Sequence, residues 1–255
     1  MKKIFVLKLA NFISLFWRIV PFKIRRFIFT SLFILESRDK KTREGLSRIF
    51  YIKDKLEWVI NERSIHYDNG IHPKHRLTNY HQFFIDRIKE GDTVLDVGCG
   101  IGAVALDIAK ARPRCKIIGI DINKENIFFA NKLKENYSLE NIKFIFGNII
   151  TQKGINSDVV ILSNVLEHID QRESFLNGII SNSKAKNFLI RVPLFERDWQ
   201  MPLRKELGIY YYSDLDHKIE HSVKEFKKEM NKVNLRILEI NTIWGEIWAQ
   251  CEYEE

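Results

Sequence analysis

The stretch that most constrains the fold of this chain reads VLDVGCGIGAVALDIAKA and spans residues 94–111. A short apolar run that carries Asp96 leads into three alternating glycines, and apolar residues then recur at helical spacing. Glycine suits such a turn because its backbone adopts positive φ and because no Cβ keeps a ligand away. The stretch therefore predicts a strand, a tight turn and a helix.

Two cofactors fit this turn. Gly98, Gly100 and Ala103 match the dinucleotide fingerprint G-x-G-x-x-A, which places a pyrophosphate at the helix N-terminus. With Gly102 as the third glycine, the same loop matches the D-x-G-x-G-x-G pattern of enzymes that bind S-adenosylmethionine (SAM). The carboxylate of Asp96 favours SAM, because it would repel a pyrophosphate and attract an ammonium group. An NAD(P)-dependent reductase stays open as the alternative.

Polar residues end the next two predicted strands. Asp121 closes the apolar segment CKIIGID, 19 positions after Gly102, at the interval where a carboxylate accepts hydrogen bonds from ribose hydroxyls. Asn148 closes NIKFIFGN, and its amide oxygen can accept a hydrogen bond from an adenine amino group. We assign these two residues and the isoleucines that follow them, Ile122 and Ile149, to an adenosine site.

The fourth predicted strand, SDVVILS, is apolar almost throughout, as expected for a central parallel strand, and it leads directly into NVLEHID. At this point the chain resembles class I SAM-dependent methyltransferases. Within this class, the chain is similar to the branch that carries LEH after strand four. Examples are ubiquinone-pathway O-methyltransferases and methyltransferases found with bacterial surface glycans. The motifs DVGCGIG, GIDIN, GNI and SNVLEHI follow one another in the family's order, and the likeness covers about residues 75–250.

The resemblance implies a Rossmann-like α/β fold, with a seven-stranded and mostly parallel sheet that ends in an antiparallel strand. It implies SAM as cofactor and in-line transfer of its methyl group to a hydroxyl. His168 matches the position that serves as, or near, the general base, and Glu167 stands beside it. A neutral imidazole suits this role because its pKa lies near 6.5. Some relatives carry an acid where this chain has Asn164 and are helped by a divalent ion, so we expect no metal here and place Asn164 with the cofactor site.

Residues 194–221 follow the fifth predicted strand and are too polar and aromatic for another buried unit of the sheet. We interpret them as a substrate-binding insert in which Trp199, His217 and His221 contact the acceptor. Aromatic walls with basic residues suit a sugar, or a phosphorylated or nucleotide-linked glycan. A surface loop packed by its own aromatic residues is the alternative. Beyond the insert, Ser222 is a predicted helix cap, and two strands follow.

The N-terminal segment is basic and apolar. Residues 1–35 contain seven lysines and arginines and no acid, out of a net charge of +8 for the chain. The nearly neutral remainder argues against a nucleic-acid partner. The longest uncharged runs have nine residues, short of the ~20 that span a bilayer. We predict one or two helices broken near Pro21 that bind an anionic membrane surface or cover the catalytic domain as a lid.

These patterns divide the chain into a helical extension, residues 1–65, and a methyltransferase domain, residues 66–255. In the loop before the first strand, Arg76 is a candidate partner for the SAM carboxylate, and a helix of about ten residues is expected to follow and to end at Gly91. Three scattered cysteines fit a reducing cytosol, at the inner face of the membrane if the extension binds lipid. A membrane-associated scaffold without catalysis is a further alternative.

Overall fold

The structure is a computed structural model that describes residues 10, 12–68, 72–152 and 154–255. The chain divides into two compact units, Met1–Gly70 and Ile71–Glu255.

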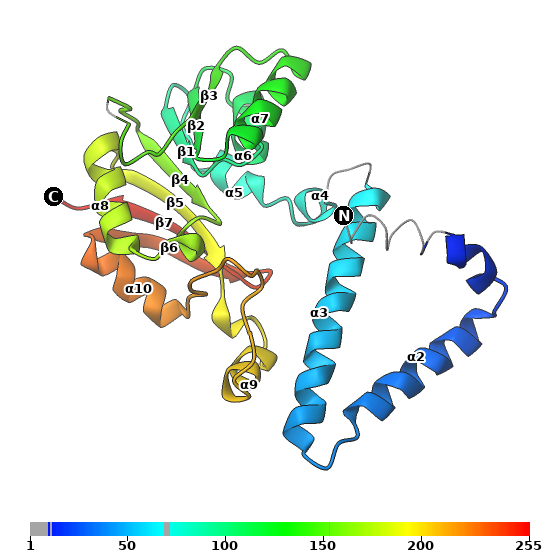
Figure 1. Ribbon diagram of the computed structural model, residues 1–255. Coiled ribbons are helices and arrows are strands. Elements are labelled where there is room, and N and C mark those ends of the chain that lie inside the picture. The colour runs from blue at the N-terminus through cyan, green and yellow to red at the C-terminus, as the bar shows by residue number, and fades with distance from the viewer. Residues whose placement is uncertain (1–9, 11, 69–71, 153) are drawn as a thin grey trace. The chain divides into compact units, whose positions relative to one another are not determined.

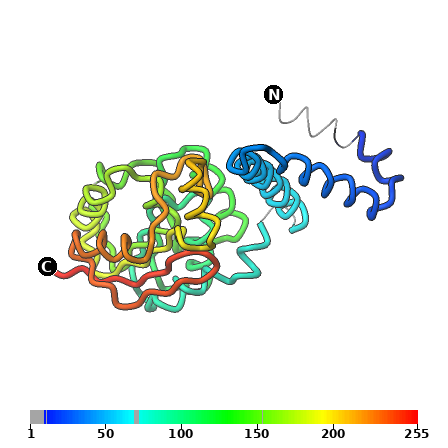
Figure 2. The backbone as a smooth tube through the Cα atoms, turned by 90° about the horizontal axis from the view of Figure 1, so that it is seen from below, coloured from blue at the N-terminus to red at the C-terminus, as the bar shows by residue number. Residues whose placement is uncertain are grey.

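The first unit contains a hairpin of two helices, α2 (Phe22–Ser37) and α3 (Thr42–Tyr67), as Figures 1 and 2 show. Arg48 on α3 joins the two helices at their turn. Its guanidinium forms ion pairs with Glu36 and with Asp39, the latter at 2.9 Å. The two helices are therefore held together where the chain reverses.

The helix α2 has no buried residue. It begins directly after Pro21, and the preceding helical residues 12–17 end before it, so the break predicted near this proline is confirmed. Among the described residues, no helix combines the length and the apolar character needed to cross a bilayer. The large apolar side chains exposed along α2 are Phe22, Ile24, Phe27, Ile28, Phe29, Leu32, Phe33, Ile34 and Leu35.

The second unit is built on one seven-stranded sheet in the order β3-β2-β1-β4-β5-β7-β6. All pairs are parallel except those that β7 forms with β5 and with β6. The predicted fold class, a mostly parallel Rossmann-like sheet with a terminal antiparallel strand, is confirmed. The strands are β1 (Thr93–Val97), β2 (Lys116–Asp121), β3 (Ile142–Phe146), β4 (Val159–Ser163), β5 (Asn187–Pro193), β6 (Leu235–Ile243) and β7 (Glu246–Tyr253).

Helices cover both faces of this sheet (Figure 1). Because successive residues of a strand point to opposite faces, neighbouring residues enter two different cores. In β1, Leu95 packs into one core together with side chains of α8 and α10. Its neighbour Val94 packs into a second core with side chains of α6 and α7. These helices are α6 (Ala103–Ala111), α7 (Lys124–Asn136), α8 (Arg172–Ser183) and α10 (Val223–Lys232).

The segment before β1 contains less helix than predicted, because the helix of about ten residues expected to end at Gly91 already ends at Ile85. It forms two short helices, α4 (Lys74–Thr78) and α5 (His81–Ile85). Asn79 between them adopts the left-handed conformation with φ 47°, which ends α4. The cap predicted for α10 is confirmed, because the Ser222 hydroxyl accepts a hydrogen bond from the Glu225 N–H in a capping box.

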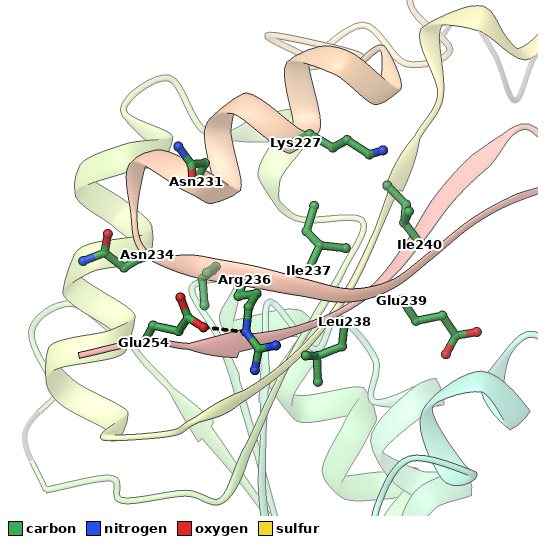
Figure 3. A pocket seen from close by; sticks show the side chains of 10 residues that line it. Lys227, Asn231, Asn234, Arg236, Ile237, Leu238, Glu239, Ile240 and Glu254 are labelled. Carbon is green, nitrogen blue, oxygen red and sulfur yellow. Dashed lines mark ion pairs between the residues drawn. The ribbon is translucent and has the colours of Figure 1, made fainter.

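A groove of about 550 Å³ lies beside the edge strand β6 and the helix α10 (Figure 3). Its lining runs along β6 from Leu235 to Ile240, with Lys227 and Asn231 on the helix. Because Leu235 pairs with Tyr253, at the same end of the sheet as the start of β5, the groove begins at the amino ends of the parallel strands. The candidate site described next lies at their carboxyl ends.

Candidate functional site

The glycine loop after β1 takes its shape from positive φ angles and from close packing. Gly98 has φ 67°, and a Cβ built on it would lie 2.8 Å from Cγ2 of Val165. Gly100 has φ 56° and open space within 4 Å of the place where a Cβ would stand. The loop is thus packed against the turn after β4 on one side and accessible on the other.

Asp121, at the end of β2, holds this loop from the neighbouring strand. Its Oδ2 accepts a hydrogen bond from the Gly100 N–H at 2.8 Å, and its Oδ1 accepts one from the Asn123 N–H at 2.7 Å. The carboxylate is nearly buried, whereas the next residue, Ile122, is 74% exposed. The end of β2 therefore offers a fixed carboxylate beside an uncovered apolar surface.

Asp96 in β1 is buried, and its Oδ2 has no hydrogen-bond partner among the described residues. Burial, together with the charge of Asp121, raises the pKa of this carboxyl to about 7. An unpartnered buried oxygen of this kind is stabilised when a cationic ligand group approaches it. The site is thus chemically suited to a ligand that carries an ammonium group.

The other predicted cofactor residues lie in different settings. Asn148 is exposed, and its Oδ1 accepts a hydrogen bond from the Ile150 N–H at 3.0 Å, which occupies part of its accepting capacity. The side chain of Ile149 is buried in the core, so that only its backbone is available to a ligand. Arg76 lies exposed on α4, in the segment before β1.

The turn after β4 carries the LEH motif as the 3-10 helix η1 (Leu166–His168). Asn164 precedes it with φ 56°, and its side-chain N–H donates to Oε1 of Glu167 at 2.9 Å. Glu167 is fully buried, and its Oε2 has no partner among the described residues. Burial raises the pKa of this carboxyl to about 7, against the opposing effects of Asn164, His217 and Arg191.

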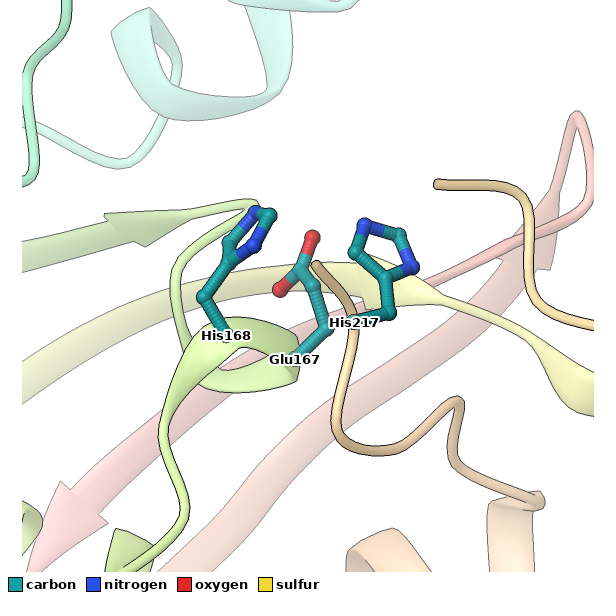
Figure 4. A group of neighbouring side chains, drawn as sticks. All are labelled: Glu167, His168 and His217. Carbon is teal, nitrogen blue, oxygen red and sulfur yellow. The ribbon is translucent and has the colours of Figure 1, made fainter. Parts of the chain in front are cut away.

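His168 and His217 lie on either side of Glu167 (Figure 4). The centroids of the two imidazole rings are 4.8 Å apart and the ring planes are inclined by 77°. Nδ1 of His168 lies 3.1 Å from Oδ2 of Asp216, an ion-pair distance without the alignment of a hydrogen bond. Each of the three residues in Figure 4 offers one nitrogen or oxygen atom within 4.8 Å of the other two.

Such a group suits proton transfer and equally a bound cation. Our expectation of no metal depends on the amide at Asn164 in place of an acid, and it stays a prediction.

The insert brings His217 to this group and leaves His221 away from it. The side chain of His217 is 7% exposed, and the Lys218 N–H donates to the carbonyl oxygen of Glu167 at 2.7 Å. His221 is fully buried, with Nε2 3.3 Å from Oε1 of Glu229 on α10. Direct contact between His221 and an acceptor, which we predicted from the sequence, is therefore not available in this structure.

Trp199, the third predicted acceptor contact, precedes α9 (Gln200–Glu206) and is 72% exposed. The short helix η2 (Phe195–Arg197) stands before it in the insert. A large exposed aromatic side chain is available to stack on a ligand. Contact between Trp199 and an acceptor stays a prediction.

Arg191 in β5 has no role among the predictions made from the sequence. Its guanidinium forms a two-pronged ion pair with Glu246 of β7, at 2.6 and 2.5 Å, and lies 3.9 Å over the ring of Tyr80. This arrangement ties the segment before β1 to the neighbouring strands β5 and β7. An arginine inside a strand of otherwise apolar residues was the only signal for it in the sequence.

Parts of this chain are similar in sequence to curated methyltransferases. A probable (S)-tetrahydroprotoberberine N-methyltransferase 2 of Papaver bracteatum is 29% identical over 102 residues, which are 39% of this chain and 28% of the plant protein. The ribosomal protein L11 methyltransferase of Thermotoga maritima is 26% identical over 156 residues, or 55% of each chain. The chain thus spans about half or less of the length of these curated relatives.

Among solved structures, the chain is similar to magnesium protoporphyrin IX methyltransferase of Synechocystis PCC 6803 with bound S-adenosylhomocysteine. The TM-score is 0.57 at 16% identity, over 71% of this chain and 83% of the other. At this identity the likeness shows the fold alone.

A family model described as a methyltransferase domain matches residues 88–251. This range begins shortly before β1 and ends within β7, so that it takes in the sheet, the glycine loop and the histidine group. It covers more than half of the chain, which therefore belongs to this family of methyltransferase domains.

Proposed function

We propose that this chain is a SAM-dependent methyltransferase. The observation that carries the proposal is the unpartnered Oδ2 of buried Asp96, which stands beside an open glycine loop held by Asp121. SAM supplies the ammonium group that would satisfy this oxygen, and its sulfonium supplies an electrophilic methyl group. The proposed binding residues are Arg76, Asp96, Gly98, Gly100, Gly102, Asp121, Ile122, Asn148, Ile149 and Asn164.

Five of these residues are assigned to particular parts of SAM. Asp121 accepts hydrogen bonds from the ribose hydroxyls through those carboxylate lone pairs that the Gly100 and Asn123 N–H groups do not use. The exposed side chain of Ile122 packs against the adenine ring, and Arg76 pairs with the SAM carboxylate. Asn148 and the backbone of Ile149 face the adenine edge.

Calorimetric titration of the full chain tests this assignment. We expect SAM to bind wild-type protein and to bind Asp121→Ala at least tenfold more weakly, because the variant loses both the ribose contact and the anchor of Gly100. Asp170→Ala, which removes an exposed carboxylate, is the matched control and should bind as wild type. Preferential binding of NADPH would instead support a reductase.

The proposed reaction is O-methylation of a hydroxyl. His168 takes the hydroxyl proton, and Glu167 stabilises the imidazolium that forms. Rate comes mainly from alignment of the attacking oxygen with the methyl carbon and sulfur. The proposal places the chain in the LEH branch of the family, supported by the histidine group around η1.

A small, glycan or lipid-linked molecule is the proposed acceptor. Exposed Trp199, and the rings of Tyr210, Tyr211 and Tyr212, which pack on one another, support it, because aromatic faces pack against sugars and lipids. A screen of nucleotide sugars and lipid-linked sugars with methyl-labelled SAM would identify the acceptor. Bound SAM with no labelled product from any acceptor would favour a scaffold without catalysis.

We further propose that residues 1–35 bind an anionic membrane surface, with the lid as the alternative. The uncovered apolar side chains of α2 and the absence of acids from this stretch of the sequence support it. In flotation assays, the full chain should bind vesicles that contain phosphatidylglycerol more strongly than phosphatidylcholine vesicles. Phe27→Ser/Leu35→Ser should reduce this binding, and the control Leu215→Ser, at an 85% exposed leucine of the second unit, should not. Equal binding by all three proteins would favour the lid.

A further inference from the structure

The carboxylate of Glu220 is the centre of the insert. Its side chain is fully buried, and a buried carboxylate is stable only when donors surround it. The Ser213 N–H and the Ser213 hydroxyl both donate to Oε1, the hydroxyl at 2.7 Å. The guanidinium of Arg197 pairs with Oε2.

His217 is the remaining partner of this carboxylate. Its Nδ1 lies 3.1 Å from Oε1 of Glu220. Burial lowers the pKa of the His217 imidazole, but the hydrogen bond to Glu220 and the charge of Glu167 raise it overall. The ring is thus held between two carboxylates from different parts of the chain.

The direction of the hydrogen bond sets the tautomer of His217. An ionised carboxylate can only accept, so the hydrogen lies on Nδ1 of the imidazole. In the neutral ring, Nε2 then carries a free lone pair. Figure 4 shows one ring nitrogen of His217 turned toward Glu167 and His168 and the other turned away from them.

The backbone fixes the ring in this place as well. The Lys218 N–H donates to the carbonyl oxygen of Glu167, so the residue after His217 is bonded to the η1 turn itself. His168, in contrast, faces Asp216, whose side chain is 70% exposed, without hydrogen-bond alignment. Of the two imidazoles, that of His217 is the more firmly oriented.

We propose that Glu220 is a positioning residue that holds His217 in the Nδ1–H tautomer, so that Nε2 of His217 is a second proton acceptor of the site beside His168. This inference rests on the proposed methyl transfer. On this second route the acceptor O–H bond breaks, its proton passes to Nε2 of His217 instead of to His168, and the ring becomes an imidazolium between Glu220 and Glu167. The oxygen lone pair forms the bond to the methyl carbon, and the electron pair of the broken C–S bond stays on sulfur.

The tautomer can be read without SAM and without any acceptor. In long-range ¹H–¹⁵N spectra of the full chain at high pH, His217 should show a protonated Nδ1 and an unprotonated Nε2. His217→Gln assigns the signals by their loss. An Nε2–H tautomer in the wild-type protein would overturn the proposal whatever the chain methylates.

Two variants separate the effect of Glu220 from general damage to the insert. Glu220→Ala should abolish the Nδ1–H pattern, because it removes the acceptor. Ser213→Ala, the matched control, removes one donor to the same carboxylate and should leave the pattern intact. If Glu220→Ala does not fold, the wild-type and Ser213→Ala spectra still decide the tautomer.

Activity gives the second readout. With an acceptor from the screen, Glu220→Ala should lower kcat by about 10²-fold, the lower range for loss of general-base catalysis, with SAM affinity unchanged by calorimetry. Unchanged kcat in a variant that has lost the tautomer would refute the role as proton acceptor. Failure of SAM to bind wild-type protein would refute the proposed function and leave the tautomer result standing.

Discussion

At the scale of single residues, Gly98 is a position where the fold has no room for a side chain. Gly98→Ala would strain a backbone with φ 67° and press a methyl group against Val165. We expect a loss of about 2–4 kcal/mol in the free energy of unfolding, from left-handed strain and overpacking combined. Urea denaturation measures it.

Gly91→Ala separates these two causes. Gly91 also has positive φ, at 96°, but open space around the position of its Cβ, so only the backbone strain should remain. A loss equal to that of Gly98→Ala would mean that the contact with Val165 contributes nothing.

Asp96 makes stability depend on pH in a definite direction. Its pKa is raised to about 7 in the folded chain from 3.8, so the folded state holds a proton that the unfolded state has lost between these values. The contribution of this carboxyl to the free energy of unfolding is complete below about pH 4 and is lost as the pH rises to about 7. Without cofactor, Asp96→Asn should therefore be stabilised relative to wild type at pH 8, by roughly 4 kcal/mol at most, and little changed at pH 4.

Urea denaturation at the two pH values checks this expectation, with Asp170→Asn as the control at an exposed carboxylate. The same Asp96→Asn variant should bind SAM more weakly, because the attraction for the ammonium group is lost. An Asp96→Asn variant that is less stable than wild type at pH 8 would contradict the interpretation that the buried carboxylate of Asp96 destabilises the chain when no ligand is bound.

At the scale of elements, the pair of Arg191 in β5 and Glu246 in β7 joins two strands and supports the segment before β1. Arg191→Met should destabilise the unit by about 3–5 kcal/mol, because it leaves Glu246 charged and nearly buried without its partner. Arg191→Met/Glu246→Gln should recover part of this loss in thermal denaturation. A double variant that is no more stable than the single one would show that packing of the guanidinium on Tyr80, and not the charge, dominates.

The elements that the sequence predicted are those whose signals are local. The strand, glycine turn and helix around Gly98 lie within 18 consecutive residues, and the later strands are each marked by a short apolar run. The short helix α4 and its end at Asn79 were not predicted, because a non-glycine residue with positive φ leaves little trace in a pattern of apolar residues.

The cofactor half of the candidate site could be predicted from local patterns, and the acceptor half could not. Asp96 and Asp121 lie at ends of adjacent strands, which a sequence pattern can identify. The approach of His217 to Glu167 joins residues 50 positions apart through an irregular insert. Nothing in the sequence distinguishes His217 from His221, and only packing sends one to the site and the other onto Glu229.

At the scale of the whole molecule, the division at Gly70 and Ile71 predicts separable properties. A chain of residues 71–255 contains the complete sheet and all the proposed SAM contacts. We expect it to bind SAM within about twofold of the full chain by calorimetry and to lose binding to anionic vesicles. A large fall in SAM affinity would instead indicate that the first unit acts as a lid on the site.

The place of β7 in the sheet also bears on how the molecule is made. Although β7 is the last strand in chain order, it lies between β5 and β6 and supplies Glu246 to Arg191. A nascent chain that stops before Glu246 leaves β5 with an open edge and Arg191 with an uncompensated charge. Assembly of the site must therefore wait until the strand Glu246–Tyr253 has been synthesised, which delays any methyl transfer until translation of the domain is complete.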